Sequence, residues 1–345
     1  MATVNNIDQK SRETGTLYQN PIDITNKNSS QTIIYDFISY KSCVLDVGCA
    51  CGDLGIVLNK NKKCTVYGME FDIKSIQIAL KTNSYENIWQ CDLETLEIND
   101  FIDFFNYFDF IIFGDILEHL QRPNDIINKF TKLLKPNGKF IISLPNLSHG
   151  SIKAQIINNN FIYTPAGTLD ETHLRFFTYK TIPAFLAKNN LQINELKCTF
   201  LPLNGFYDYT IYDDLDIKTL TKIINDIHSY ILQYVFTASK SEFISKQEII
   251  DNNYMFLSLP NYHSEYLINL RTKYQRRLRF SPKHIFKIPA QVYIFFQKNK
   301  IKNLFTLYDF QLIYVEIEKR LKNKNWFMKN IVLYPLQIWG KLIER

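Results

Sequence analysis

Twelve consecutive residues indicate the fold of this chain: Val44-Leu45-Asp46-Val47-Gly48-Cys49-Ala50-Cys51-Gly52-Asp53-Leu54-Gly55. The stretch starts as an apolar run, passes through a turn of small residues and continues into a helical pattern. A buried strand that enters a helix through a glycine-rich turn lets the backbone approach a ligand at the carboxyl edge of a sheet. We therefore expect a ligand-binding α/β domain that begins near residue 43.

The alternation of strands and helices continues through the next two hundred residues. Helical patterns cover residues 74–81, 124–134 and 179–188. The segments with strand composition are Cys43–Gly48, Cys64–Met69, Ile88–Cys91, Phe108–Phe113, Lys139–Leu144, Leu191–Phe200 and Ile231–Ser239. Strands that alternate with helices indicate right-handed βαβ units and a parallel sheet. The predicted fold is a doubly wound, seven-stranded, Rossmann-like α/β sheet.

The glycine spacing argues against a dinucleotide cofactor. The dinucleotide motif is G-x-G-x-x-G, and this chain has Ala50 and Asp53 where that motif needs its second and third glycines. A carboxylate at Asp46 would also repel a pyrophosphate, whereas it would attract a ligand that carries a cationic centre. Nicotinamide and flavin cofactors are therefore disfavoured.

Carboxylates also end the next two expected strands. Glu70 follows Gly48 by 22 residues, a spacing at which a strand-end carboxylate can accept hydrogen bonds from both ribose hydroxyls. Asp92 and Leu93 follow the third strand, where an acid and an apolar side chain can frame a base. A solvated strand end is the alternative for each carboxylate taken alone.

Together these motifs resemble the class I S-adenosylmethionine-dependent methyltransferases, in particular the quinone-biosynthesis and bacterial glycan-associated enzymes. The resemblance covers roughly residues 18–240. It rests on the glycine turn, Glu70, Asp92-Leu93, Asp115-Ile116-Leu117-Glu118-His119-Leu120, Leu134-Lys135-Pro136-Asn137-Gly138-Lys139 and Ser143-Leu144-Pro145-Asn146. It implies S-adenosylmethionine as cofactor and S-adenosylhomocysteine as product.

The resemblance also implies a set of cofactor-binding residues. The methionine part of the cofactor would lie near Asp46, Gly48, Cys49, Ala50 and Gly52. Glu70 and Phe71 would lie at the ribose, Asp92 and Leu93 at the adenine, and Asp115 above the fourth strand. A polar N-terminal segment with Tyr18 and Ser30 would cover the cofactor, although an ordinary helix start is the alternative for it. Ala50 replaces a glycine that is frequent in the family.

Transfer of a methyl group to a hydroxyl requires a group that accepts the proton, and histidine is the usual one. His173 is our first prediction for this base and His149 the second, because both bracket a predicted substrate lid at residues 145–177. Arg175, Asn146 and His119 are the predicted substrate contacts, and Arg175 can clamp a phosphate or carboxylate. Structural roles in the lid and its attachment remain open for these side chains.

The sequence predicts no metal site, because Glu118 and His119 belong to the recurring family motif. The chain reads Phe113-Gly114-Asp115-Ile116 after the fourth strand, in place of the D/N-P-P-Y/F/W motif of enzymes that methylate amino groups of nucleic acids. A nucleic-acid acceptor is therefore disfavoured.

Composition sets the class of protein and its expected location. The 345 residues are 46% apolar and 21% charged, which is typical of a folded globular protein. The six cysteines form no C-x-x-C ligand sets and are expected to be free thiols, and the first ten residues lack the apolar core of a signal peptide. We expect a cytoplasmic protein, with residues 1–42 covering the cofactor, 43–240 forming the methyltransferase domain and 241–345 forming an extension.

The extension is basic and aromatic. Residues 265–345 contain 17 Lys and Arg against 5 Asp and Glu, whereas the rest of the chain contains 23 against 29. Leu267, Leu270, Tyr274 and Leu278 form one helical stripe with arginines around it, which favours a mostly helical region. Packing on the main domain or in a homodimer, contact with an anionic membrane at the inner face, and nucleic-acid binding remain alternatives, the last without a recognisable RNA-binding motif.

The function expected first is O-methylation of a cell-surface saccharide or of its phosphorylated or lipid-linked precursor. The alternatives are a small-molecule or quinone O-methyltransferase and a cofactor-binding scaffold without catalysis.

Overall fold

The computed structural model describes residues 19, 21–201, 203, 212, 214–216, 219, 220, 222, 223 and 226–240. Tyr18 and the rest of residues 1–18 lie outside the described residues, as does the whole of the predicted extension, 241–345. The expectations for the tail and for its partners therefore stay predictions.

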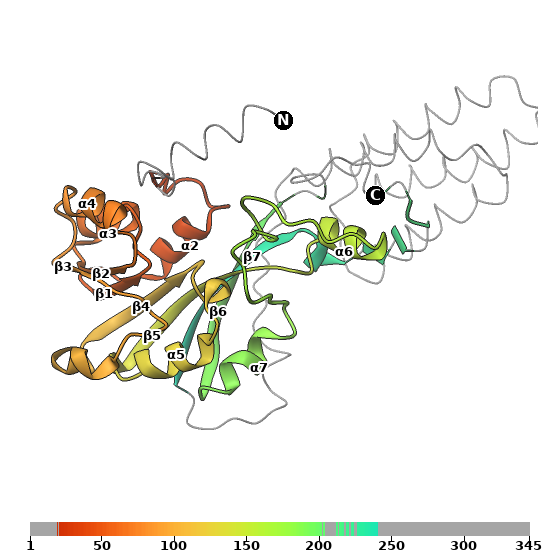
Figure 1. The fold of residues 1–345 in the computed structure, drawn as a ribbon. Coiled ribbons are helices and arrows are strands. Elements are labelled where there is room, and N and C mark those ends of the chain that lie inside the picture. Colours follow the sequence, from red (N-terminus) through yellow and green to blue (C-terminus); the bar gives the residue numbers. More distant parts are fainter. Residues whose placement is uncertain are drawn as a thin grey trace, which may run out of the picture. The chain divides into compact units, whose positions relative to one another are not determined.

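The described chain forms one seven-stranded sheet in the order β3-β2-β1-β4-β5-β7-β6 (Figure 1). Its strands are β1 (Cys43–Val47), β2 (Thr65–Glu70), β3 (Asn87–Gln90), β4 (Phe108–Gly114), β5 (Leu134–Pro145), β6 (Leu191–Phe200) and β7 (Ile231–Lys240). The doubly wound α/β fold predicted from the sequence is confirmed. Because β1 stands at the point where the strand order reverses, the turn that follows it lies where α/β sheets bind their ligands.

The direction of β7 differs from the prediction. It is antiparallel to both β5 and β6, whereas the pairs from β3 to β5 are parallel. The apolar run of β7 is buried on both faces, and such a run has the same composition in either direction. The sequence pattern therefore showed that the strand exists and left its direction open.

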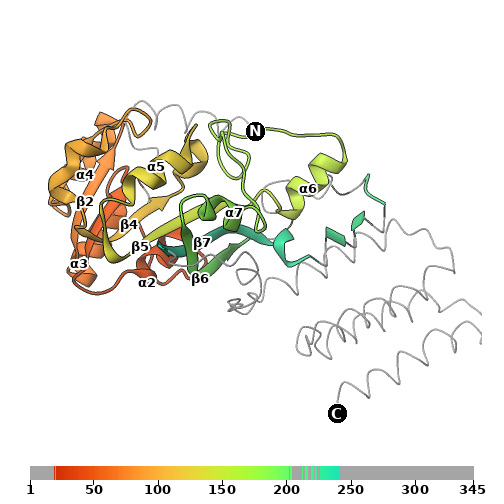
Figure 2. The ribbon, with the colours of Figure 1, turned by 90° about the horizontal axis from the view of Figure 1, so that it is seen from below.

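Helices cover both faces of the sheet. They are α2 (Ser30–Phe37), α3 (Asp53–Lys62), α4 (Ile73–Leu80), α5 (Pro123–Phe130), α6 (Gly150–Ile157) and α7 (Ile182–Ala187), with 3-10 turns η1 (Ile98–Phe104), η2 (Leu117–His119) and η4 (Ile227–Ser229). Figure 1 shows α2, α3 and α4 on one side of the sheet and α5 and α7 on the other, and Figure 2 shows the same elements from below. In the part of the chain that the structure describes, no helix has the length and apolar character needed to cross a membrane.

Two apolar cores hold these layers together. One contains Leu45, Phe113, Phe130 and Phe185 and lies on the side of α5 and α7, and the other contains Ile34, Leu58 and Val66 on the side of α2 and α3. The helix expected over 124–134 ends at Phe130, because the following residues turn into β5. Pro183 stands in the first turn of α7, where its missing N–H is tolerated.

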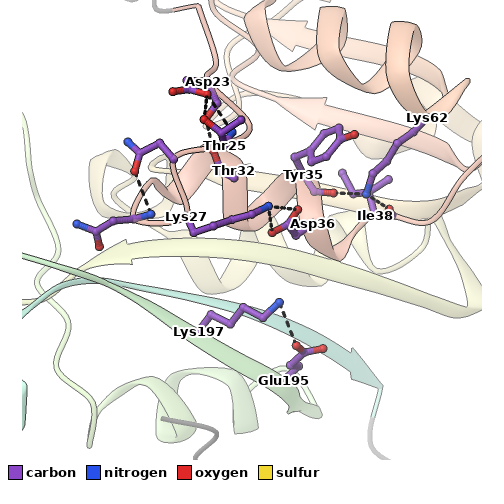
Figure 3. Close-up of polar contacts among 12 residues, drawn as sticks. Asp23, Thr25, Lys27, Thr32, Tyr35, Asp36, Ile38, Lys62, Glu195 and Lys197 are labelled. Atoms are coloured by element: carbon purple, nitrogen blue, oxygen red, sulfur yellow. Dashed lines mark hydrogen bonds and ion pairs between the residues drawn. The ribbon is translucent and has the colours of Figure 1, made fainter. Parts of the chain in front are cut away.

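Helix α2 is tied to its neighbours by polar contacts at both ends (Figure 3). Lys62, in the last turn of α3, donates from Nζ to the carbonyl oxygens of Tyr35 and Ile38 at the end of α2. Before the helix, the Asn28 amide exchanges two hydrogen bonds with the backbone of Phe200 at the end of β6. The N-terminal segment is therefore fixed on the sheet from residue 28 onward.

The segment between β5 and α7 folds back over the carboxyl edge of the sheet. Asn146 forms a β-bridge with Phe177, and the amides of Leu174 and Arg175 both donate to the backbone carbonyl of Glu118. Residues 158–177 form the later part of the substrate lid predicted over residues 145–177, after α6, and we use the word lid below for residues 158–177. Its contact with Glu118 brings the lid residues to the turn that follows β4.

Candidate active site

The glycine turn after β1 has the backbone geometry of a ligand-binding turn. Gly48 and Gly52 have φ angles of 75° and 86°, and the amides of Gly48 and Cys49 both donate to the carbonyl of Met69. A Cβ at Gly48 would lie 2.1 Å from Cδ1 of Ile116, so this position accepts glycine alone. Ala50 has a φ of 45°, which costs an L-residue about 1–2 kcal/mol.

The carboxylate of Glu70 is bound to this turn. Its Oε2 accepts from the Ala50 amide at 2.9 Å, and its Oε1 accepts from the amides of Phe71 and Asp72 at 2.7 and 2.9 Å. Three of the roughly four lone-pair sites of the carboxylate are used in this way, so one acceptor site, on Oε2, remains for a ligand hydroxyl. The predicted ribose carboxylate is therefore held rigidly at the end of β2.

Asp46 lies buried at the end of β1, one strand away from Glu70. Its Oδ2 accepts a hydrogen bond of 2.8 Å from the hydroxyl of Tyr85, a residue that the sequence analysis did not select. Burial raises the pKa of Asp46 to about 6, the Tyr85 hydrogen bond lowers it, and the Glu70 charge raises it. A cationic ligand group beside Asp46 would favour its charged form.

The other predicted cofactor residues lie along the same edge. Phe71 is 70% exposed directly after Glu70, and Asp92 follows β3 with its Oδ1 accepting from the Glu94 amide. Asp115 directly follows β4 with a φ of 56°, and its Oδ1 accepts from Ser143 and Gln233. Cys49, Leu93 and Ser30 are described as well, Ser30 as the first residue of α2. Their contacts with a cofactor stay predictions.

Two histidines and a glutamate meet where the lid rests on the sheet edge. The ligand atoms of Glu118, His119 and His173 all lie within 4.8 Å of one another, and the two imidazole centroids are 4.7 Å apart. Glu118 is 1% exposed, and its Oε2 has no hydrogen-bond partner in the structure. Burial raises the pKa of Glu118 well above its usual range, with the Asp115 charge adding to the shift.

Hydrogen bonds set the orientation of both imidazoles. The hydroxyl of Thr172 donates to Asp170 at 2.6 Å, so its oxygen accepts from Nδ1–H of His119 at 3.0 Å. The Nδ1 of His173 donates to the carbonyl of Thr168 at 3.1 Å. Both rings therefore have the lone pair of Nε2 available, and burial next to His173 lowers the pKa of His119.

This donor set can hold a divalent cation. Two imidazole nitrogens whose Nδ1–H groups donate to protein oxygens, together with one carboxylate, form a common first shell for zinc-like metals. The sequence analysis assigned no metal, because nothing in the pattern showed that the lid brings His173 to Glu118 and His119.

We expect the protein to bind Co²⁺ as a visible probe of this set, because Co²⁺ accepts the same nitrogen and oxygen ligands as zinc. Visible absorption of the cobalt-loaded protein should appear with the wild type and be lost in His173→Ala and Glu118→Gln. His228→Gln, which changes a half-buried histidine outside the set, is the control. An unchanged spectrum in both cluster variants would place the cobalt elsewhere.

Two predicted site residues, His149 and Asn146, have structural roles instead, while the substrate contact of Arg175 stays a prediction. His149 is completely buried, its Nδ1 accepting from Ser151 and its Nε2 donating to the carbonyl of Leu201, so neither nitrogen is available to a substrate. Asn146 donates to the carbonyls of His228 and Ile231 and accepts from the Ser148 amide. Arg175 donates to the carbonyls of Leu174 and Gln121, which ties the lid to the domain.

His149 should make stability depend on pH. Burial lowers its pKa to about 4, below the ordinary value of about 6.5 that it has in the unfolded chain. Between these values the unfolded chain binds the proton and the folded chain does not, so this contribution is complete above pH 6.5 and is lost toward pH 4. We expect the wild type to lose about 3 kcal/mol more unfolding free energy across this window than His149→Asn.

Urea denaturation of both proteins at several pH values measures this difference. Reading the difference between the two proteins removes the effect of other buried groups such as Asp46, whose pKa shift has the opposite direction. Parallel stability curves would mean that His149 has the same pKa in the folded and unfolded chains.

Comparison with known proteins agrees with this geometry. A protein-family model described as a methyltransferase domain matches residues 38–196, which include the glycine turn, Glu70 and the Glu118-His119 pair. This part of the chain is therefore similar to a methyltransferase domain, in agreement with the resemblance to the class I S-adenosylmethionine-dependent methyltransferases. S-adenosylmethionine is the cofactor of such methyltransferases, and the residues around the glycine turn fit it, because Asp46 lies at the end of β1, Glu70 at the end of β2 and Asp92 just after β3.

Curated relatives of this chain are named as O-methyltransferases. The mitochondrial ubiquinone biosynthesis O-methyltransferase of Dictyostelium discoideum is 30% identical over 193 residues, which are 52% of this chain and 59% of that protein. The ubiquinone biosynthesis O-methyltransferase of Bartonella tribocorum is 28% identical over 180 residues, covering 51% of this chain and 70% of that protein. The alignment thus spans less than two thirds of the Dictyostelium protein.

Among solved structures, the chain is similar to magnesium protoporphyrin IX methyltransferase from Synechocystis with bound S-adenosylhomocysteine. The match covers 69% of this chain and 95% of the Synechocystis chain. The TM-score of this match is 0.43 and the sequence identity is 16%.

Proposed function

We propose that the protein transfers the methyl group of S-adenosylmethionine to a hydroxyl of a small aromatic acceptor of the quinone-precursor type. The observation that carries the proposal is the cluster of Glu118, His119 and His173 beside the glycine turn. The ubiquinone biosynthesis O-methyltransferases among its relatives support this acceptor class over the saccharide that the sequence analysis put first.

The cluster is connected to the glycine turn through one side chain. Ile116 stands three residues before His119, and its Cδ1 lies against the Cα of Gly48, where a Cβ would have no room. The methionine end of the cofactor and the imidazole of His119 are therefore expected on either side of the same short turn after β4. An acceptor hydroxyl above this turn would face both.

The cofactor supplies an electrophilic methyl group on a sulfonium. The protein has to hold the acceptor oxygen in line with that methyl group, which provides a large part of the rate enhancement. It also has to activate the hydroxyl, which the cluster can do by accepting its proton at the Nε2 of His119 or by holding a cation that lowers the hydroxyl pKa. Of the two imidazoles, that of His119 is the more exposed: His119 is partly buried, whereas His173 is only 8% exposed.

The proposal is tested by supplying S-adenosylmethionine with an isotope-labelled methyl group and a panel of acceptors. We expect labelled methyl ethers from dihydroxybenzoate-type compounds, and no label on matched aromatics that lack the hydroxyl or on sugar nucleotides. Label on sugars alone would restore the saccharide acceptor.

A chelator distinguishes the two ways of activating the hydroxyl. If turnover stops in EDTA and returns with an added divalent cation, the cluster acts through a metal. If turnover persists in EDTA and follows the ionisation of a histidine, the imidazole accepts the proton directly.

A further inference from the structure

The hydroxyl of Tyr85 joins two elements of the cofactor site. It donates to Oδ2 of Asp46 at 2.8 Å and accepts from the amide of Gly55 at 3.2 Å. Asp46 lies in β1 and Gly55 in the first turn of α3, so the hydroxyl links the two ends of the glycine turn. Tyr85 itself stands in the loop before β3.

The ring of Tyr85 explains glycines that the sequence analysis attributed to ligand approach. A Cβ at Gly55 would lie 2.2 Å from Cε2 of the ring, and Cβ atoms at Gly52 and Gly68 would lie 3.0 and 3.1 Å from ring carbons. Non-bonded carbon atoms pack at about 3.5–4.0 Å, so the ring occupies space that these glycines leave open. Gly55 therefore makes room for Tyr85 alone, whereas Gly52 makes room for Tyr85 and Ala79, and Gly68 for Tyr85 and the sulfur of Cys49.

The same hydroxyl acts on the charge of Asp46. The titratable groups that interact with this carboxylate are Tyr85, Glu70 and Cys49. A hydrogen bond donated to the ionised carboxylate favours the charged form, against the effects of burial and of the Glu70 charge. Because these effects leave the pKa of Asp46 at about 6, the loss of the Tyr85 hydrogen bond would raise it toward neutrality.

We propose that Tyr85 is a positioning residue of the cofactor site, whose hydroxyl holds the Asp46 carboxylate in the orientation and charge state that bind the cationic end of S-adenosylmethionine. The inference rests on the cofactor of the proposed function and not on its acceptor. Tyr85 acts through Asp46 and through the glycine turn, and it has no part in the transfer itself.

The test is isothermal titration of S-adenosylmethionine into the full chain and into Tyr85→Phe between pH 5.5 and 8.5. This variant keeps the ring against the three glycines and removes only the hydroxyl. Wild-type affinity should fall as the pH drops through about 6, and in the variant this fall should begin at higher pH. At pH 6.5 the variant should bind at least about tenfold more weakly, and at pH 8.5 its affinity should approach that of the wild type.

Two further proteins make the result specific. Tyr67→Phe removes a hydroxyl that pairs with the hydroxyl of Tyr107, 3.1 Å away, and should leave the pH profile unchanged. Asp46→Asn should bind weakly at every pH without the step near pH 6, and adding Tyr85→Phe to it should weaken binding little further, because both changes act on one interaction.

If Tyr85→Phe loses the same affinity for S-adenosylmethionine at every pH, the role of Tyr85 is reduced to packing. If the variant has the same affinity as the wild type at every pH, the inference is wrong. Both results presuppose that the wild type binds S-adenosylmethionine. A wild type that binds none would instead overturn the cofactor assignment, which separates the two failures.

Discussion

Replacing His119 with alanine should lower the rate of methyl transfer by about 10²- to 10⁴-fold, because the acceptor hydroxyl would lose the group that activates it. The affinity for S-adenosylmethionine should stay near the wild-type value, since the side chain lies beyond the glycine turn. Single-turnover transfer of a labelled methyl group, together with calorimetric binding of the cofactor, separates the two effects.

A second variant tests how His119 is held. Thr172→Val removes the hydroxyl that links His119 to Asp170 and should cost less than the loss of the imidazole, since the ring remains. His228→Gln serves as the control, because this histidine pairs with Tyr234 outside the cluster. Near-normal turnover in His119→Ala would leave positioning of the acceptor as the main source of catalysis.

Replacing Glu70 with alanine should weaken S-adenosylmethionine binding by about 10- to 100-fold and lower the unfolding free energy by about 1–3 kcal/mol. Both effects arise from the same carboxylate. It accepts three backbone N–H groups that fix the glycine turn, which affects stability, and it is the predicted acceptor of the ribose hydroxyls, which affects affinity. Calorimetric titration and urea denaturation measure the two quantities.

Glu97→Ala, which removes an exposed carboxylate of the same domain, is the matched control and should change neither quantity. Glu70→Gln keeps one acceptor oxygen and should fall between alanine and wild type. Stability lost without any loss of cofactor affinity would restrict Glu70 to a structural role.

The sequence predicted the parts of the fold and of the site that depend on neighbouring residues, and it missed those that depend on residues far apart in the chain. The strand ends at Asp46 and Glu70 were correctly placed, because apolar runs ended by carboxylates are a local signal. Burial of His149 and Asn146 was missed, because it depends on residues far along the chain, such as Leu201 and Ile231.

Tyr85 was missed for the same reason. Its hydroxyl partners lie 39 and 30 positions earlier in the chain, and a single aromatic residue in a loop carries no periodic signal. The glycines beside it were visible in the sequence, but a glycine does not reveal which neighbour it makes room for. The cluster of Glu118, His119 and His173 likewise required knowledge of how the lid folds back.

The place of β7 between β5 and β6 has a consequence for synthesis of the protein. Strand β6 is made first, yet among the described strands its one partner is β7, which ends at Lys240. During translation, β1 to β5 can pair as they emerge, while β6 has no partner until β7 has left the ribosome. The nascent chain therefore carries an unpaired β6 and an uncovered β5 edge, and such edges favour aggregation. A chain stopped before residue 231 would keep both edges open permanently.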